Sequence, residues 1–211
     1  MTSTGVGWLD QWWMLLTAIG LSSTSGLRAY LPLLALAIGS QIPGGNGGDL
    51  ITVAPWLTGF AHSGGLWAAV ALLILAFIEF VVDKIPVLDH INDAIHTVIR
   101  PVAGGFIMAA IDNPISHNSP WVAAIIGAIL AFTVHGVKAT TRPVVTATTM
   151  GIGNPAVSAG EDILAVLMTL LSVFLPILLI IGLVIVLLIM WKPITRGLGR
   201  LFGRGARAGL D

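Results

Sequence analysis

The segment from residue 89 to residue 100 carries four ionisable side chains at helical spacing. They are Asp89, Asp93, His96 and Arg100, which lie four, three and four residues apart. At about 100° per residue, such spacing places all four on one narrow stripe of a helix. Two carboxylates and an imidazole are side-chain types that bind a divalent metal, and they also pair well with arginine. The stripe therefore predicts an ion-pair network between helices, a site for an ion or polar solute, or a metal site at Asp89, Asp93 and His96.

Two neighbouring groups of ionisable residues are also spaced for one helix face. An acidic pair four residues apart, followed directly by a lysine, ends a hydrophobic run: Glu79, Asp83 and Lys84. A basic stripe with spacings of three and four ends another run: His135, Lys138 and Arg142. We expect the acidic and basic stripes to lie at the same depth and to face each other.

Burial against lipid would be costly for these groups. One charged side chain at the centre of a bilayer costs about 2.5–3.5 kcal/mol, and six would cost about 15–20 kcal/mol. A typical domain is stable by only about 5–15 kcal/mol. The stripes must therefore face other helices, a water-filled cavity or the cytoplasmic interface.

Two glycine-containing stretches interrupt hydrophobic runs. The polar residues of the first, "GLSSTSGLR", include Ser22, Ser23, Ser25 and Arg28, and those of the second, "GIGNPAVSAGED", include Asn154, Ser158, Glu161 and Asp162. We expect unwound backbone at 22–25 and at 151–158, with a half-helix N-terminus beyond it that favours an anion. Such breaks point to a transporter cavity, although small residues also allow tight helix contacts.

The two interruptions share a local pattern. "TSGLRAYL" aligns with "SAGEDILA", and this alignment pairs Arg28 with Asp162. It predicts an ion pair between the two segments. An internal duplication, either inverted or direct, is compatible with such similarities and stays open.

The composition requires a membrane for these segments. Of the 211 residues, 56% are hydrophobic and 9% are charged, against about 25% charged in soluble domains. The net charge is zero, so there is no electrostatic basis for nucleic-acid binding. Cysteine is absent, so there is no disulfide framework and no thiolate nucleophile. The N-terminus has no basic stretch typical of a cleaved signal peptide.

We predict an all-α polytopic membrane protein with about six crossings, two or three of them discontinuous or amphipathic. The expected crossings are Trp12–Gly39, Leu66–Val82, Pro86–Ile111, Trp121–Val137, Ala139–Ala156 and Ile163–Met190. Residues 1–191 would form a single transmembrane domain, and residues 192–211 a basic cytoplasmic tail. The distribution of Lys and Arg then places both termini in the cytoplasm and the protein in the bacterial inner membrane.

Three segments together resemble a bacterial membrane family known as domain of unknown function 4126. They are "GLSSTSGLRAYLPLLAL", "FIEFVVDKIPVLDHINDAIHTVIRPVAG" and "TATTMGIGNPAVSAGEDILA". The resemblance implies a small polytopic inner-membrane protein and supplies no activity. Separately, Glu79, Asp83 and Lys84 are similar to the Glu-x-Gly-Asp-Lys signature of cation/proton exchangers, with one more residue between the acids and one copy instead of two.

The function that explains both breaks and both stripes is a transporter or channel for a small ion or polar solute, without a cofactor. A second interpretation is an enzyme acting on a lipid-linked phosphate, with a metal at Asp89, Asp93 and His96 and the phosphate held by Lys138 and Arg142. A third is an accessory subunit of a larger membrane complex. The expected partners are the lipid bilayer and the transported solute, with a homo-oligomer or larger complex left open.

Overall fold

The computed structural model describes residues 7–44, 48–85, 88–150, 152–178, 181–182 and 184–185, without the side chains of residues 88–91, 142 and 143. The elements in this part are α1 (Trp8–Ser25), α2 (Tyr30–Gly39), α3 (Thr58–Val82), α4 (Leu88–Ala110), α5 (Pro114–Asn118), α6 (Pro120–Thr149) and α7 (Asn154–Phe174). The described residues up to Pro176 form one compact unit, and Ile177 begins a second. The predicted tail, residues 192–211, lies outside the described residues.

The fold is all-helical, and three of its helices suit a membrane. In the described residues, α3, α6 and α7 are long and apolar enough to cross a bilayer. Their outward faces carry large apolar side chains, with Trp67 76% and Phe77 66% exposed on α3. Exposed apolar area of this kind is stable in lipid and not in water. The protein is therefore an integral membrane protein.

Residues 22–25, where we expected unwound backbone, are helical. Ser22, Ser23 and Ser25 are part of α1, and the turn comes later, between Gly26 and Ala29. The hydroxyl of Ser23 donates to the carbonyl of Ile19 at 2.8 Å, which satisfies this side chain within the helix. Serine and threonine that bond one turn back are compatible with a continuing helix, so the prediction of unwound serines was wrong.

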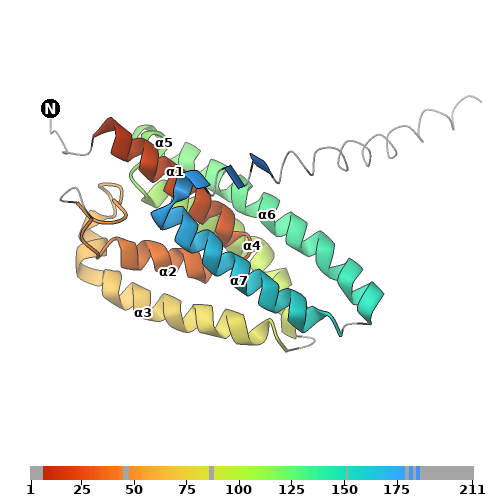
Figure 1. Cartoon of the computed structure of the whole chain (residues 1–211). Helices are drawn as coiled ribbons and strands as arrows, with labels where there is room; N and C mark the ends of the chain where they lie inside the picture. The colour runs from red at the N-terminus through yellow and green to blue at the C-terminus, as the bar shows by residue number, and fades with distance from the viewer. Residues whose placement is uncertain are drawn as a thin grey trace, which may run out of the picture. The chain divides into compact units, whose positions relative to one another are not determined.

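The first predicted crossing consists of two antiparallel helices. Ser22 Oγ donates to the carbonyl of Gly104, and Arg28 reaches Asp83, so α1 runs toward the start of α4 and the end of α3. From there α2 returns, and its last residue, Gly39, contacts Ile51. Figure 1 shows α1 and α2 as a hairpin, with α3 running back beside α2.

The predicted fourth and fifth crossings are one helix. Instead of ending near Val137, α6 continues through the threonine-rich segment to Thr149. Thr140 and Thr148 are satisfied by carbonyls one turn back, as in α1. Met150 has a φ of 52°, in the left-handed region that ends helices, and α7 begins at Asn154. The second predicted break is therefore a turn between two antiparallel helices.

Glycines allow α4 and α6 to pack closely. A Cβ on Gly127 of α6 would collide with the carbonyl oxygen of Gly104, and one on Gly105 would lie 2.8 Å from the carbonyl oxygen of Ala124. In the preceding hairpin, a Cβ on Gly26 would collide with the carbonyl oxygen of Ala131. Small residues bring the backbones of α1, α4 and α6 together, which is how helices associate in a bilayer.

Candidate functional site

Arg28 lies at the centre of a buried group of charges between the helices. From the α1–α2 turn, Arg28 Nη1 donates to Asp83 Oδ2 at 2.6 Å, and Nη2 donates to Asp162 Oδ1 on α7. Lys84 Nζ donates to the other oxygen of Asp162 at 2.6 Å. The Arg28 side chain is only 5% exposed. The turn is thus joined by ion pairs to α3 and α7, including the Arg28–Asp162 pair expected from the sequence.

Asp83, at the end of α3, also joins this turn to α4 and α6. Its Oδ1 accepts from Asn92 Nδ2 at 2.6 Å, while Lys138 Nζ lies 3.4 Å from Oδ2. Lys138 in turn lies 3.0 Å from Glu161 Oε2 and 3.8 Å from Asp93 Oδ1. The predicted facing of acidic and basic stripes is therefore present at this end of the helices.

The carboxylate of Glu79, a residue of α3, lies at the start of α2. Its two carboxylate oxygens accept the backbone N–H groups of Ala29 and Tyr30, at 3.3 and 3.4 Å. The N-cap residue of α2, Ala29, makes no side-chain hydrogen bond to these N–H groups. A helix N-terminus favours negative charge because its first N–H groups lack partners. The anion expected at this half-helix is thus supplied by the protein itself.

The two buried histidines differ in their hydrogen bonds. His135 Nδ1 lies 2.7 Å from Arg100 Nη1, and a guanidinium can only donate, so Nδ1 accepts and the proton is on Nε2, 3.1 Å from Thr97 Oγ1. His96 Nδ1 lies 2.8 Å from the carbonyl of Asn92 and must donate. His96 Nε2 faces Glu79 Oε1 at 3.4 Å. His135 is therefore neutral here, whereas His96 donates from Nδ1 and turns its Nε2 toward a carboxylate.

We call the linked residues the charged cluster. Its described members are Arg28, Glu79, Asp83, Lys84, Asp93, His96, Arg100, His135, Lys138, Glu161 and Asp162. These side chains comprise five carboxylates and four Lys or Arg cations, so with neutral histidines their sum is −1. A proton on His96 brings the sum to zero. The side chains of Asp89 and Arg142 lie outside the description.

Some buried atoms of the charged cluster have no hydrogen-bond partner among the described residues, among them Arg100 Nε, Arg100 Nη2 and His96 Nε2. Arg100 Nη2 lies 3.3 Å from Asp93 Oδ1 and 3.6 Å from Glu79 Oε1, which are ion-pair contacts without hydrogen-bond geometry. Such groups are costly to bury unless something bridges them, as a water does across gaps of this size.

A pocket of about 400 Å³ opens beside these charges, between α2, α3 and α7. Arg28, Glu79 and Asp162 border it, but almost all of its surface is apolar, with Leu31 and Val166 among the lining residues. Three charged groups from three segments thus border one space.

The family model described as domain of unknown function, DUF4126, matches residues 15–196. The chain belongs to the DUF4126 family. No curated protein and no solved structure matches it. The DUF4126 match contains the whole charged cluster and the pocket beside it.

Some predicted site residues of this DUF4126 protein lie outside the charged cluster. Ser22 and Ser25 bond carbonyls of α4, those of Gly104 at 2.9 Å and Arg100 at 3.4 Å, and so attach α1 to α4. Asn154 Oδ1 accepts from Thr146 at the α6–α7 turn. Ser158 is buried, and its hydroxyl has no hydrogen-bond partner among the described residues. Ser22, Ser25 and Asn154 thus hold neighbouring elements together, and the predicted place of all four residues on a solute path stays a prediction.

The predicted metal site stays a prediction. Among the described residues, no group of three or more His, Asp or Glu side chains is placed to hold a metal ion. The side chain of Asp89, one of the three predicted ligands, lies outside the description. His96 and Asp93 take part in the ion pairs described above.

The sequence interpretation missed three contributors to the site. Asn92 bonds Asp83, Thr97 bonds His135, and the ring of Tyr30 packs edge-on against His96 with centroids 5.6 Å apart. Asn92 and Thr97 could have been found, because each is four residues from a member of the predicted stripe. Tyr30 could not, because it reaches His96 only through the α1–α2 turn.

Proposed function

We propose that this protein is a membrane transporter for a small ion or polar solute, with the charged cluster on its path. The supporting observation is the pocket whose wall contains Arg28, Glu79 and Asp162 in otherwise apolar surroundings. Ionisable groups inside membrane proteins are costly and usually mark an ion or proton pathway. The pocket places a space next to these groups, although their side chains are themselves almost fully buried.

The charge of the cluster favours a cation, and in particular a proton. Five carboxylates and four Lys or Arg cations leave one negative charge among the described side chains when the histidines are neutral. His96 Nε2 faces Glu79 and can take up a proton there. We propose His96 and Glu79 as the proton-carrying pair and Arg28 and Asp162 as the pair that opens to admit a solute.

The helix directions also give an orientation. If Lys84 and Lys138 are cytoplasmic, as their charge suggests, then the charged cluster lies toward the cytoplasm. Beyond Lys138, α6 continues for about three further turns to Thr149, so the α6–α7 turn extends past the cluster. The start of α1 packs near Ile111, at the opposite end. We therefore propose an outer position for Trp8, in place of the cytoplasmic N-terminus predicted from charge alone.

Flux measurement tests the proposal. Purified protein in phosphatidylethanolamine–phosphatidylglycerol vesicles, loaded with a pH-sensitive dye, is given gradients of protons, Na⁺, K⁺ and chloride in turn. We expect proton flux above that of empty vesicles, and loss of at least tenfold in Glu79→Gln and Arg28→Ala. Asp10→Asn, at the far end of α1, serves as the control and keeps wild-type flux. Absence of flux for every gradient contradicts a transporter, and flux that all variants preserve contradicts a path through the charged cluster.

A second candidate is an accessory subunit in which the charges only lock the helices. The observation in its favour is Asp83, whose carboxylate accepts hydrogen bonds from Arg28, Lys138 and Asn92 and so connects four segments. This candidate predicts that Asp83→Asn lowers thermal stability in a protein that shows no flux. A transporter instead shows flux in the wild type and loses both properties in the variant.

A further inference from the structure

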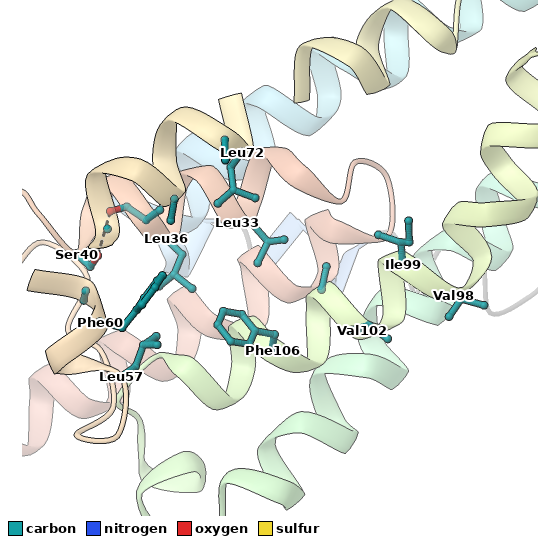
Figure 2. Close-up of a pocket in the computed structure, with 16 residues that line it drawn as sticks. Leu33, Leu36, Ser40, Leu57, Phe60, Leu72, Val98, Ile99, Val102 and Phe106 are labelled. Atoms are coloured by element: carbon teal, nitrogen blue, oxygen red, sulfur yellow. Dashed lines mark hydrogen bonds between the residues drawn. The ribbon is translucent and has the colours of Figure 1, made fainter. Parts of the chain in front are cut away.

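A second pocket of about 700 Å³ lies along α2, α3 and α4, away from the charged cluster. Its lining is apolar apart from Ser40, whose hydroxyl donates to the carbonyl of Ala37 on its own helix. Figure 2 shows side chains from the three helices directed into this shared space, Leu33 from α2, Phe60 from α3 and Phe106 from α4 among them. No polar group of the described lining is available to a polar ligand.

The sequence of α3 shapes this pocket into a groove. Small residues recur along the face of α3 that forms it: Ala61, Gly65, Ala68 and Ala71. On the opposite wall, α4 presents Val98, Val102 and Phe106. Val98 and Val102 remain 67% and 65% exposed, so α3 and α4 do not close on each other there. The groove is open at the side, where the apolar outer face of α3 meets the bilayer.

The length of the groove matches one leaflet. From Phe60 to Leu72 the axis of α3 advances by about 18 Å. The hydrocarbon core of a bilayer is about 30 Å thick, so a leaflet is roughly 15 Å. At the Phe60 end, Trp56 is 53% exposed and packs edge-on against Phe106, as expected of an aromatic residue at the membrane interface. The groove thus extends from the interface toward the bilayer centre.

Length distinguishes a lipid chain from a helix of another protein copy. A membrane-spanning helix would extend over the whole hydrocarbon core of about 30 Å, whereas the groove extends over about 18 Å, close to the depth of one leaflet. The groove measures about 700 Å³, within the range of about 300–1,000 Å³ common for small-molecule sites. We propose that this groove is a specific binding site for one acyl chain of a membrane phospholipid, which lies lengthwise between α3 and α4. The proposal is independent of the transport function.

Photo-crosslinking of a lipid tests this site. The full chain is reconstituted with phosphatidylglycerol that carries a diazirine in the middle of one acyl chain, irradiated and mapped by peptide mass spectrometry. We expect adducts on α4 between Val98 and Phe106 to exceed those on the outer face of α3 by at least fivefold. Adducts spread evenly over the exposed faces of α3, α6 and α7 would show only bulk lipid and would overturn the proposal.

Matched tryptophan variants on α3 provide a second test. Ala68→Trp fills the groove and should reduce the α4 adducts at least tenfold, whereas Leu73→Trp, at an exposed position outside the groove lining, should leave them unchanged. Native mass spectrometry of the same samples should find one phospholipid retained by the wild type and none by Ala68→Trp. Should Ala68→Trp fail to fold, Val102→Trp fills the groove from α4. Equal lipid retention in all folded variants, or a dimer with no lipid, refutes the site.

Discussion

Arg28 and Asp162 are 134 residues apart in the chain and form a partly buried ion pair that joins the α1–α2 turn to α7. Arg28 also donates to Asp83, so one guanidinium holds two carboxylates from two further helices. Lys84 pairs with the same Asp162 but stays one-third exposed. The two cations around Asp162 therefore contribute differently to stability. Solvent can take the place of the more exposed cation, Lys84, when it is removed.

This difference predicts unequal stability losses. Arg28→Met leaves two buried carboxylates without their shared cation, and removal of one partner of a buried pair costs about 3–5 kcal/mol. Lys84→Met removes a more exposed cation, for which about 0–1 kcal/mol is expected. Thermal unfolding of both variants in the same detergent should show a large loss of Tm for Arg28→Met and a small one for Lys84→Met. Equal losses would mean that Arg28 is not the central cation.

The contact between Glu79 and the start of α2 predicts a local change in backbone exchange. Loss of a helix cap costs about 0.5–2 kcal/mol. In Glu79→Ala, the amides of Ala29 and Tyr30 should therefore exchange about 2- to 30-fold faster with deuterium. Glu161→Gln changes another carboxylate of the charged cluster and should leave these two amides unchanged. Hydrogen exchange with mass spectrometry measures both, and unchanged protection in Glu79→Ala would exclude the cap.

Replacement by alanine at two glycine positions of α6 should change the stability of the protein in different ways. At Gly127 a Cβ collides with the backbone of Gly104, so Gly127→Ala should lose about 1–3 kcal/mol of stability. At Gly136 nothing lies within 4 Å of the added carbon, and alanine should be neutral or stabilise the helix by about 0.5–1 kcal/mol. Thermal unfolding of the two variants compares them directly. A tolerated Gly127→Ala would indicate looser packing of α4 against α6.

The hydrogen bond from Arg100 predicts the protonation of His135. Because Nδ1 accepts from the guanidinium, the ring should be the neutral form with its proton on Nε2. Nitrogen-15 NMR of labelled histidine distinguishes this form by the shifts of the two ring nitrogens. His62, which is exposed near the start of α3, provides the solvent-exposed reference in the same spectrum. A doubly protonated His135 would require Arg100 to point elsewhere.

The charged cluster was largely predictable because spacing alone places charges on a helix face. The stripe at 93–100, the pair at 79–83 and the basic residues 135 and 138 needed only helical periodicity, and local similarity suggested the partners Arg28 and Asp162. The helix ends were not predictable. Serine, threonine and glycine occur in broken and in continuous membrane helices, and the difference depends on whether their hydroxyls bond one turn back. Ser23 and Thr148 do so, and their helices therefore continue past these residues, which shifts both turns relative to the sequence prediction.

The order of synthesis gives the Arg28–Asp162 pair a consequence for biogenesis. A ribosome adds about 5–20 residues per second, so roughly 7–27 s separate the emergence of Arg28 from that of Asp162. Throughout this interval the first hairpin contains an arginine whose final partner does not yet exist. Asp83 emerges earlier and can pair with that arginine first, but the nascent chain completes this group of charges only when α7 brings Asp162.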